Sequence, residues 1–133
     1  MIFWFEKHNK LSWIITILIA FFIFYISSLS FEFAPKGGFG WKTMAYHFYA
    51  FFFLSYFLLT SLIKGNLKNK NLLLIAIIIA ILYGISDEIH QIFVPGRAFT
   101  ILDILTNSVG VLLAGYLYLS VLLGKEIRLI SNM

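Results

Sequence analysis

The sequence has no cysteine and few charged side chains. Only 12% of its 133 residues are Asp, Glu, Lys or Arg. The absence of cysteine excludes a disulfide framework and a metal site built on thiolates. Soluble domains are about a quarter charged, and disordered chains and coiled coils are also rich in charge, so the low charge content excludes all three classes.

Long apolar runs take the place of the missing charge: 61% of the residues are hydrophobic. The first run, Leu11–Leu29, has 19 residues and no acidic or basic side chain. As a helix it would span about 28 Å, close to the thickness of the hydrocarbon core of a membrane. Similar runs follow at about 45–63, 72–91 and 101–123. The sequence therefore predicts an all-α membrane protein: one domain over 1–133, with four transmembrane helices in a small bundle.

The loop charges predict the orientation of this bundle. If the helices alternate, seven basic residues share the side of both termini and three lie on the other side. The side with more Lys and Arg is normally cytoplasmic, so we expect a multi-pass cell-membrane protein with both termini in the cytoplasm. The net charge of +4 then reflects topology, and no nucleic-acid partner is predicted. The first group is Lys7, Lys10, Lys64, Lys68, Lys70, Lys125 and Arg128; the second is Lys36, Lys42 and Arg97.

Polar side chains gather at the outer side of the predicted bundle. The second and fourth spans begin there and the third ends there, and residues three or four positions apart on a helix are neighbours. Charged side chains inside a membrane are costly unless they meet a partner or water. We expect these residues to form a site: His47, Asp87, Glu88, Gln91, Arg97, Asp103 and Asn107, with His90 at its edge.

A tight turn connects the third and fourth spans. Val94–Pro95–Gly96–Arg97 is typical of a type II turn, with Pro at the second position and Gly supplying a positive φ at the third. Such a turn would return Arg97 toward Glu88.

The start of the fourth span has a structural alternative. Thr100 and Asp103 match a capping box, which by itself explains the acidic residue. Further along the same helical stripe, Gly110 and Ala114 form a close-packing surface. This surface either packs within the chain or permits a homodimer.

Two interpretations of the cluster concern Arg97. With Gln91 and Asn107, its guanidinium could clamp a phosphate or a carboxylate. Alternatively, an Arg–carboxylate network could simply lock the third span to the fourth.

Two further interpretations concern the acidic residues. Glu88, His90 or Asp103 could act as catalytic acid or base, with Arg97 stabilising the developing charge. A divalent ion could be held by Asp87, Glu88, His90 and Asp103. Their spacing matches no metal-ligand motif, so neither a metal nor another cofactor is predicted.

A long motif follows the third span. Residues 86–97 are Ser-Asp-Glu-Ile-His-Gln-Ile-Phe-Val-Pro-Gly-Arg, and Asp103, Asn107 and Gly110 come after them. This order resembles the VanZ-like family, and the resemblance covers residues 11–123. His47 resembles the family's earlier motif, although Thr43 and Met44 stand where an Asp-Lys pair is usual. The resemblance implies a small integral membrane protein associated with low-level resistance to teicoplanin, a glycopeptide that acts on peptidoglycan precursors outside the membrane.

Together these observations predict an outward-facing site that recognises the head group of a cell-envelope lipid or peptidoglycan precursor and lowers teicoplanin susceptibility. Membrane lipids, among them a phosphate-bearing envelope lipid, are the expected partners. One alternative is a membrane-embedded hydrolase or transferase that acts on a lipid-linked head group through Glu88, Asp103 and Arg97. Another is a purely structural bundle. Transport is not favoured, because small multidrug exporters carry an acidic residue in their first span and this chain has none there.

Overall fold

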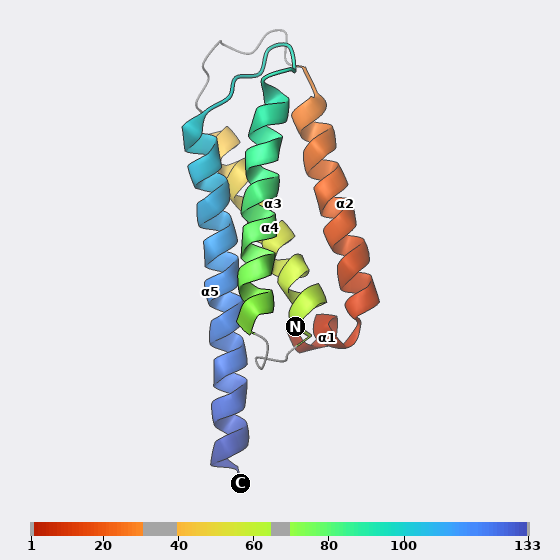
Figure 1. The fold of residues 1–133 in the computed structure, drawn as a ribbon, viewed down its shortest axis with the longest axis vertical. Helices are drawn as coiled ribbons and strands as arrows, with labels where there is room; N and C mark the ends of the chain where they lie inside the picture. Colours follow the sequence, from red (N-terminus) through yellow and green to blue (C-terminus); the bar gives the residue numbers. More distant parts are fainter. Residues whose placement is uncertain (1, 31–39, 65–69, 133) are drawn as a thin grey trace.

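The structure is a computed structural model that describes residues 2–30, 40–64 and 70–132. All regular structure in these ranges is helical, and the four long helices run along one axis (Figure 1). In chain order the helices are α1 (Ile2–Lys7), α2 (Asn9–Ser28), α3 (Trp41–Ile63), α4 (Lys70–Gln91) and α5 (Ile101–Ser131).

Helices α2, α3, α4 and α5 are each long and apolar enough to cross a membrane, which confirms the predicted all-helical fold with four spans. Successive long helices run in opposite directions (Figure 1). Helices α2 and α4 therefore end where α3 and α5 begin. We call this end of the bundle the site end, and the opposite end, which holds α1, the α1 end.

All four long helices are longer than the predicted spans, α2 and α4 by one or two residues and α3 and α5 by more. Helix α3 begins at Trp41 instead of about residue 45, and Gly40 in an extended conformation is its N-cap. Helix α5 continues to Ser131 instead of ending near 123, and it extends beyond the other helices (Figure 1). Lys125 and Arg128 are unsuited to hydrocarbon, but Lys and Arg favour helix and are stabilising near a helix C-terminus. Lys36 and Lys68 lie outside the described residues.

The short helix α1 was not predicted from the sequence. Its six residues are too few for a stable isolated helix, and contacts with the bundle hold it. The hydroxyl of Tyr118 donates a hydrogen bond to Glu6 Oε1 (2.6 Å), and the Phe5 ring packs edge-on against Phe57 at 5.1 Å between centroids. These contacts close the α1 end of the bundle.

Helix α3 packs against all the other helices, and its interface with α5 is the most extensive in the bundle. Close approach depends on Gly110, where an added Cβ atom would overlap the carbonyl oxygen of Phe48 and lie 3.1 Å from the amide nitrogen of Phe52. Ala114, one turn further along α5, is fully buried. The packing surface predicted at Gly110 and Ala114 is thus used within the chain, and a homodimer through it stays a prediction.

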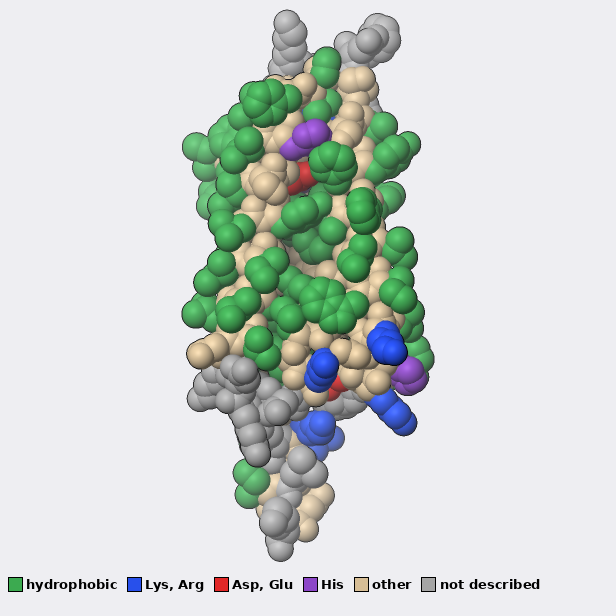
Figure 2. Space-filling view, turned by 45° about the vertical axis from the view of Figure 1, so that its right-hand side comes forward, with side chains coloured by type: hydrophobic (Ala, Val, Ile, Leu, Met, Phe, Trp, Pro, Cys, Tyr) green, Lys and Arg blue, Asp and Glu red, His purple; other side chains and the backbone are tan. Residues whose placement is uncertain are grey.

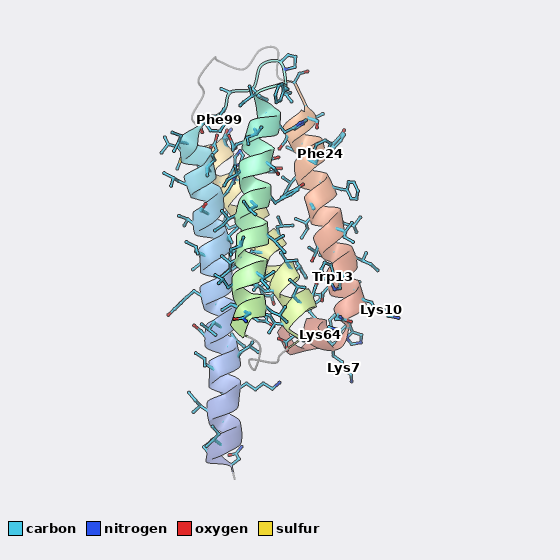
Figure 3. All side chains as sticks on the ribbon, viewed as in Figure 1. Lys7, Lys10, Trp13, Phe24, Lys64 and Phe99 are labelled. Atoms are coloured by element: carbon cyan, nitrogen blue, oxygen red, sulfur yellow. The ribbon has the colours of Figure 1, made fainter. Side chains whose placement is uncertain are left out.

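The surface of the bundle suits a membrane. Apolar side chains cover the face shown in Figure 2, while Lys and Arg gather at the α1 end. Lys7, Lys10 and Lys64 lie at that end, whereas Phe24 and Phe99 lie at the site end (Figure 3). The apolar surface between the ends consists largely of Ile, Leu and Phe side chains that are about half exposed, as expected for helices that face lipid.

Candidate functional site

Three helices bring polar side chains together at the site end. Helix α3 contributes from its second turn, α4 from its last turns and α5 from its first two turns. Six of the seven predicted site residues lie here and are at most 5% exposed, and we call them the polar cluster: His47, Asp87, Glu88, Gln91, Asp103 and Asn107.

His47 connects the three helices. Its Nδ1 atom lies 3.0 Å from Asn107 Oδ1 on α5 and 3.8 Å from Glu88 Oε1 on α4. Because an amide oxygen only accepts hydrogen bonds, Nδ1 carries a proton in this arrangement and donates a hydrogen bond to Asn107 Oδ1. The other ring nitrogen, Nε2, is buried and has no hydrogen-bond partner. The ring is therefore held in a defined orientation, and one of its nitrogens has no hydrogen-bond partner.

Only half of the predicted capping box forms at the start of α5, because the backbone amide of Thr100 bonds to Glu88 and not to the Asp103 carboxylate. Thr100 is the N-cap, and its hydroxyl oxygen accepts a hydrogen bond from the Asp103 backbone amide (3.1 Å) while donating one to Asp103 Oδ2 (2.6 Å). The Thr100 amide in turn donates to Glu88 Oε2 (3.3 Å). One oxygen of each carboxylate thus supports the turn into α5, and the second oxygen of each, Asp103 Oδ1 and Glu88 Oε1, is buried without a hydrogen-bond partner.

Asp87 and Gln91 lie toward α2. The Gln91 side-chain amide donates to Asp87 Oδ2 (3.1 Å) and to the hydroxyl of Ser27 on α2 (3.3 Å). Ser27 is itself buried. This contact extends the polar cluster to a fourth helix that was not expected to take part.

Arg97 follows the predicted turn: Gly96 has a positive φ of 79°, and the Arg97 amide donates to the carbonyl of Val94 (3.1 Å). Its guanidinium donates to two carbonyl oxygens at the end of α2, those of Ile26 (2.6 Å) and Leu29 (3.2 Å). A cation at a helix C-terminus is favourable because the last carbonyls lack partners within the helix. Arg97 therefore ties the turn to α2, a contact that the sequence did not indicate.

His90 points away from His47. Its Nε2 atom lies 3.0 Å from the Ser28 hydroxyl, and its ring stacks on Phe24 at 4.7 Å between centroids. Residues two positions apart on a helix differ by about 200° in direction, so His90 and Glu88 occupy opposite faces of α4. Among the described residues, the group of side chains spaced to share a metal ion combines Glu88 with His47 and does not include His90.

The polar cluster contains an unusual set of unpartnered atoms. Buried polar groups almost always have a hydrogen-bond partner, and each one without a partner costs about 1–3 kcal/mol. Among the described side chains, the buried polar atoms without a hydrogen-bond partner all belong to the polar cluster or to the neighbour of His47. They are Tyr46 Oη, His47 Nε2, Glu88 Oε1, Asp103 Oδ1 and Asn107 Nδ2.

Besides Ser27, two residues of this region were not predicted from the sequence. Tyr46 directly precedes His47, and its T-shaped ring contact with it has a centroid distance of 5.5 Å. Gly84 lets α4 approach α5, because an added Cβ atom there would lie 3.3 Å from Asn107 Cβ and 3.2 Å from Phe51. Their adjacency to polar residues in otherwise apolar spans was the only signal in the sequence.

An apolar groove of about 550 Å³ lies between the first turns of α3 and α5, next to the polar cluster. The residues of α3 that line it flank His47, and those of α5 alternate with Asp103 and Asn107. The lining is formed by Met44, Ala45, Phe48, Tyr49, Leu102, Leu105, Thr106 and Val109.

The arrangement has two chemical capabilities. Its unpartnered atoms include donors, on Tyr46 and Asn107, and carboxylate acceptors, so it can bind a polar group of mixed character. In addition, His47, Asp87 and Glu88 each offer one ligand atom within 4.8 Å of the others, which is a spacing that suits a metal ion.

Comparison with known proteins supports the resemblance found in the motif. The family model described as VanZ/LLP1 matches residues 11–123, which include every residue of the polar cluster and all four spans except the first two residues of the first span and the last two of the last. No curated protein and no solved structure matches the chain. The match covers most of the sequence, and the chain is a multi-pass membrane protein that belongs to the VanZ/LLP1 family.

Proposed function

We propose that this protein binds the head group of a phosphate-bearing lipid of the cell envelope at the polar cluster, on the outer side of the membrane. Through this binding it would restrict the access of a glycopeptide such as teicoplanin to its target. The family relationship and the polar character of the site end support this proposal.

The observation that carries the proposal is the set of unpartnered buried atoms. Two of them, Tyr46 Oη and Asn107 Nδ2, can donate hydrogen bonds, and two carboxylate oxygens, on Glu88 and Asp103, can accept them. A head group that combines phosphate with hydroxyl or amine groups offers the complementary acceptors and donors. Its binding would remove the cost of leaving these atoms without partners.

The groove between α3 and α5 supports a lipid as the ligand. It is open and almost entirely apolar, and its lining includes chain neighbours of His47, Asp103 and Asn107. A lipid with its head group at the cluster and an acyl chain in the groove would bury the apolar lining while staying parallel to the spans. A soluble phosphate compound would leave this groove unused.

The distribution of charge supports an outward-facing site. Of the basic residues whose side chains are described, Lys7, Lys10, Lys64, Lys125 and Arg128 are on the α1 end or on the part of α5 beyond it, whereas Lys42 and Arg97 are at the site end. A cytoplasmic α1 end follows from this bias. Because the chain has no cysteine, single cysteines at Lys42 and at Ser131 can test it with a membrane-impermeant maleimide on whole cells: Lys42→Cys should react and Ser131→Cys should not.

Native mass spectrometry of the purified full chain tests head-group binding. The central comparison is Tyr46→Phe with Tyr116→Phe, because both remove one hydroxyl and Tyr116 is 67% exposed on α5. The buried Tyr46 hydroxyl has no hydrogen-bond partner, so its removal should leave the thermal stability unchanged or raise it. If it contacts the head group, Tyr46→Phe should bind the lipid about fivefold more weakly, as expected for one hydrogen bond of about 1 kcal/mol.

Two results would contradict the proposal. The first is a wild-type protein that retains no phosphate-bearing lipid. The second is equal lipid retention by Tyr46→Phe, Tyr116→Phe and a third variant, Asp103→Asn, all with wild-type stability.

Catalysis is the second candidate, and the orientation of His47 favours it. Its Nδ1 proton is held by Asn107, which leaves Nε2 free to accept a proton, as a general base must. A hydrolase or transferase acting on a lipid-linked head group would use His47 with Glu88 or Asp103. Product analysis in vesicles that contain labelled phospholipid tests this: Glu88→Gln with wild-type turnover would eliminate the enzyme proposal.

A further inference from the structure

We propose that His47, Asp87 and Glu88 bind a divalent transition-metal ion, with Zn²⁺ and Mn²⁺ as the best-matched ions. The three side chains come from α3 and α4 and meet inside the bundle at the site end, where all three are buried.

The spacing of the three side chains suits one shared ion. Each offers a ligand atom, and these atoms all lie within 4.8 Å of one another. Ligand atoms at about 2.0–2.2 Å from a Zn²⁺ ion lie about 3.3–3.6 Å apart in tetrahedral geometry. A bound ion therefore requires the side chains to contract by about 1 Å. Because His47 Nδ1, which lies 3.8 Å from Glu88 Oε1, donates a hydrogen bond to Asn107, the ring must also turn for Nε2 to bind the ion.

The balance of charge favours a cation. Asp87 and Glu88 are neighbours on α4, and both are at most 4% exposed. Asp103, a third buried carboxylate, lies just across the turn, where the Thr100 backbone and side chain link it to Glu88. Buried carboxylates at membrane depth are costly without compensating charge. Arg97 acts electrostatically on Glu88, and a divalent ion between α3 and α4 would add positive charge beside Asp87 and Glu88.

The unpartnered atoms point to a ligand at this place. Glu88 Oε1 and His47 Nε2 are buried, carry lone pairs and accept no hydrogen bond. Asn107 Oδ1 accepts the Nδ1 proton of His47 (3.0 Å). A backbone or side-chain oxygen on the second ring nitrogen is the usual support for a metal-binding histidine, because it fixes the ring and the tautomer.

The donor set indicates the kind of ion. One imidazole and two carboxylates suit Zn²⁺ or Mn²⁺, whereas Ca²⁺ and Mg²⁺ favour sites made of oxygen alone and Cu⁺ favours sulfur. Three protein ligands leave at least one coordination position open. If the head-group function proposed above holds, a phosphate oxygen of the lipid would take this position, which would explain how an acidic cluster accepts an anionic ligand.

Metal binding can be measured on the full chain in detergent, independently of any lipid. The protein is treated with a chelator, and Zn²⁺ or Mn²⁺ is then titrated while metal content, thermal stability and, for Mn²⁺, the electron paramagnetic resonance spectrum are recorded. We expect one ion per chain, a rise in Tm on metal addition, and at least a roughly 100-fold loss of affinity in Glu88→Gln and in His47→Gln, because each removes a direct ligand.

His90→Gln is the matched control for His47→Gln. His90 is on the same end of the bundle but contacts Ser28 and Phe24, so its loss should leave metal affinity unchanged. Asp87→Asn keeps the size of the side chain and provides a second ligand variant should Glu88→Gln fail to fold. A folded wild type that binds neither ion after chelation would overturn the inference, as would equal affinity in His47→Gln and His90→Gln.

The lipid measurement separates this inference from the proposed function. Stoichiometric metal binding without any retained phosphate-bearing lipid would support the metal site and contradict head-group binding. Lipid retention that is unchanged by chelation, in a protein that binds no metal, would overturn the metal site and leave head-group binding in place.

Discussion

Replacing Gly110 with alanine would place a Cβ atom inside the closest contact between α5 and α3. At this position the new atom would overlap the carbonyl oxygen of Phe48 and approach the amide nitrogen of Phe52 to 3.1 Å. Both are backbone atoms, so no rotation of a side chain can relieve the overlap. Helix α5 would have to move away from α3 along their most extensive interface.

The size of the effect follows from two opposing contributions. Overpacking costs about 1–3 kcal/mol, and contact with backbone places Gly110→Ala in the upper part of this range. Replacing Gly with Ala inside a helix increases the free energy of unfolding by about 0.8–1.0 kcal/mol. The expected net loss in the free energy of unfolding is therefore about 1–2 kcal/mol.

Gly124 provides the matched control, because it lies on the same helix and an added Cβ atom there would meet nothing within 4 Å. In Gly124→Ala only the helix propensity changes, so this variant should be more stable than the wild type by up to about 1 kcal/mol. The two variants should thus differ by roughly 2–3 kcal/mol. Equilibrium unfolding in mixtures of mild detergent and SDS, followed by circular dichroism, measures this difference.

The same displacement should disturb the polar cluster. Asn107 lies one turn before Gly110 on α5 and holds the His47 ring at 3.0 Å, so movement of α5 would withdraw this support. Gly110→Ala should therefore weaken lipid and metal binding, whereas Gly124→Ala should not. If Gly110→Ala were as stable as Gly124→Ala, α5 would not contact the α3 backbone at this point, and the geometry derived for the cluster would be wrong.

Three further substitutions test individual contacts by the same unfolding measurement. Tyr118→Phe removes the hydrogen bond to Glu6 and should cost about 1.5–3 kcal/mol, since the acceptor is a buried carboxylate; an unchanged stability would show that α1 is not anchored there. Thr100→Ala removes the N-cap of α5 and should cost about 0.5–2 kcal/mol, whereas Thr100→Ser should restore most of it. Arg97→Ala removes two hydrogen bonds to carbonyls of α2 and should cost about 1–3 kcal/mol, while a loss of lipid binding without any loss of stability would assign Arg97 to the ligand instead.

Much of the architecture could be predicted because it is encoded locally. An apolar run of about 20 residues is sufficient to identify a span, and the four predicted runs correspond to α2, α3, α4 and α5. The turn with a positive φ at Gly96 and the Thr100 cap of α5 depend only on residues within a few positions of one another. The motif of residues 86–110 likewise indicated the family that the comparison shows.

The sequence could not show which side of each helix faces the interior of the bundle. In a membrane, lipid is as apolar as the interior of a bundle, so an apolar span does not reveal which side is buried. The neighbours of Arg97 on α2, the inclusion of Tyr46 and the direction of His90 therefore appear only once the helices are packed.

The sequence by itself determined that four apolar helices cross a membrane and that polar residues share one end, because hydropathy and chain direction suffice for both. The tertiary structure alone decided that His47 rather than His90 joins Glu88, that Asn107 orients it, and that several buried polar atoms are left without partners. The physical reason is that these relationships depend on the rotation of each helix about its own axis. That rotation is set by close packing at contacts such as Gly110 against Phe48, between residues far apart in the chain.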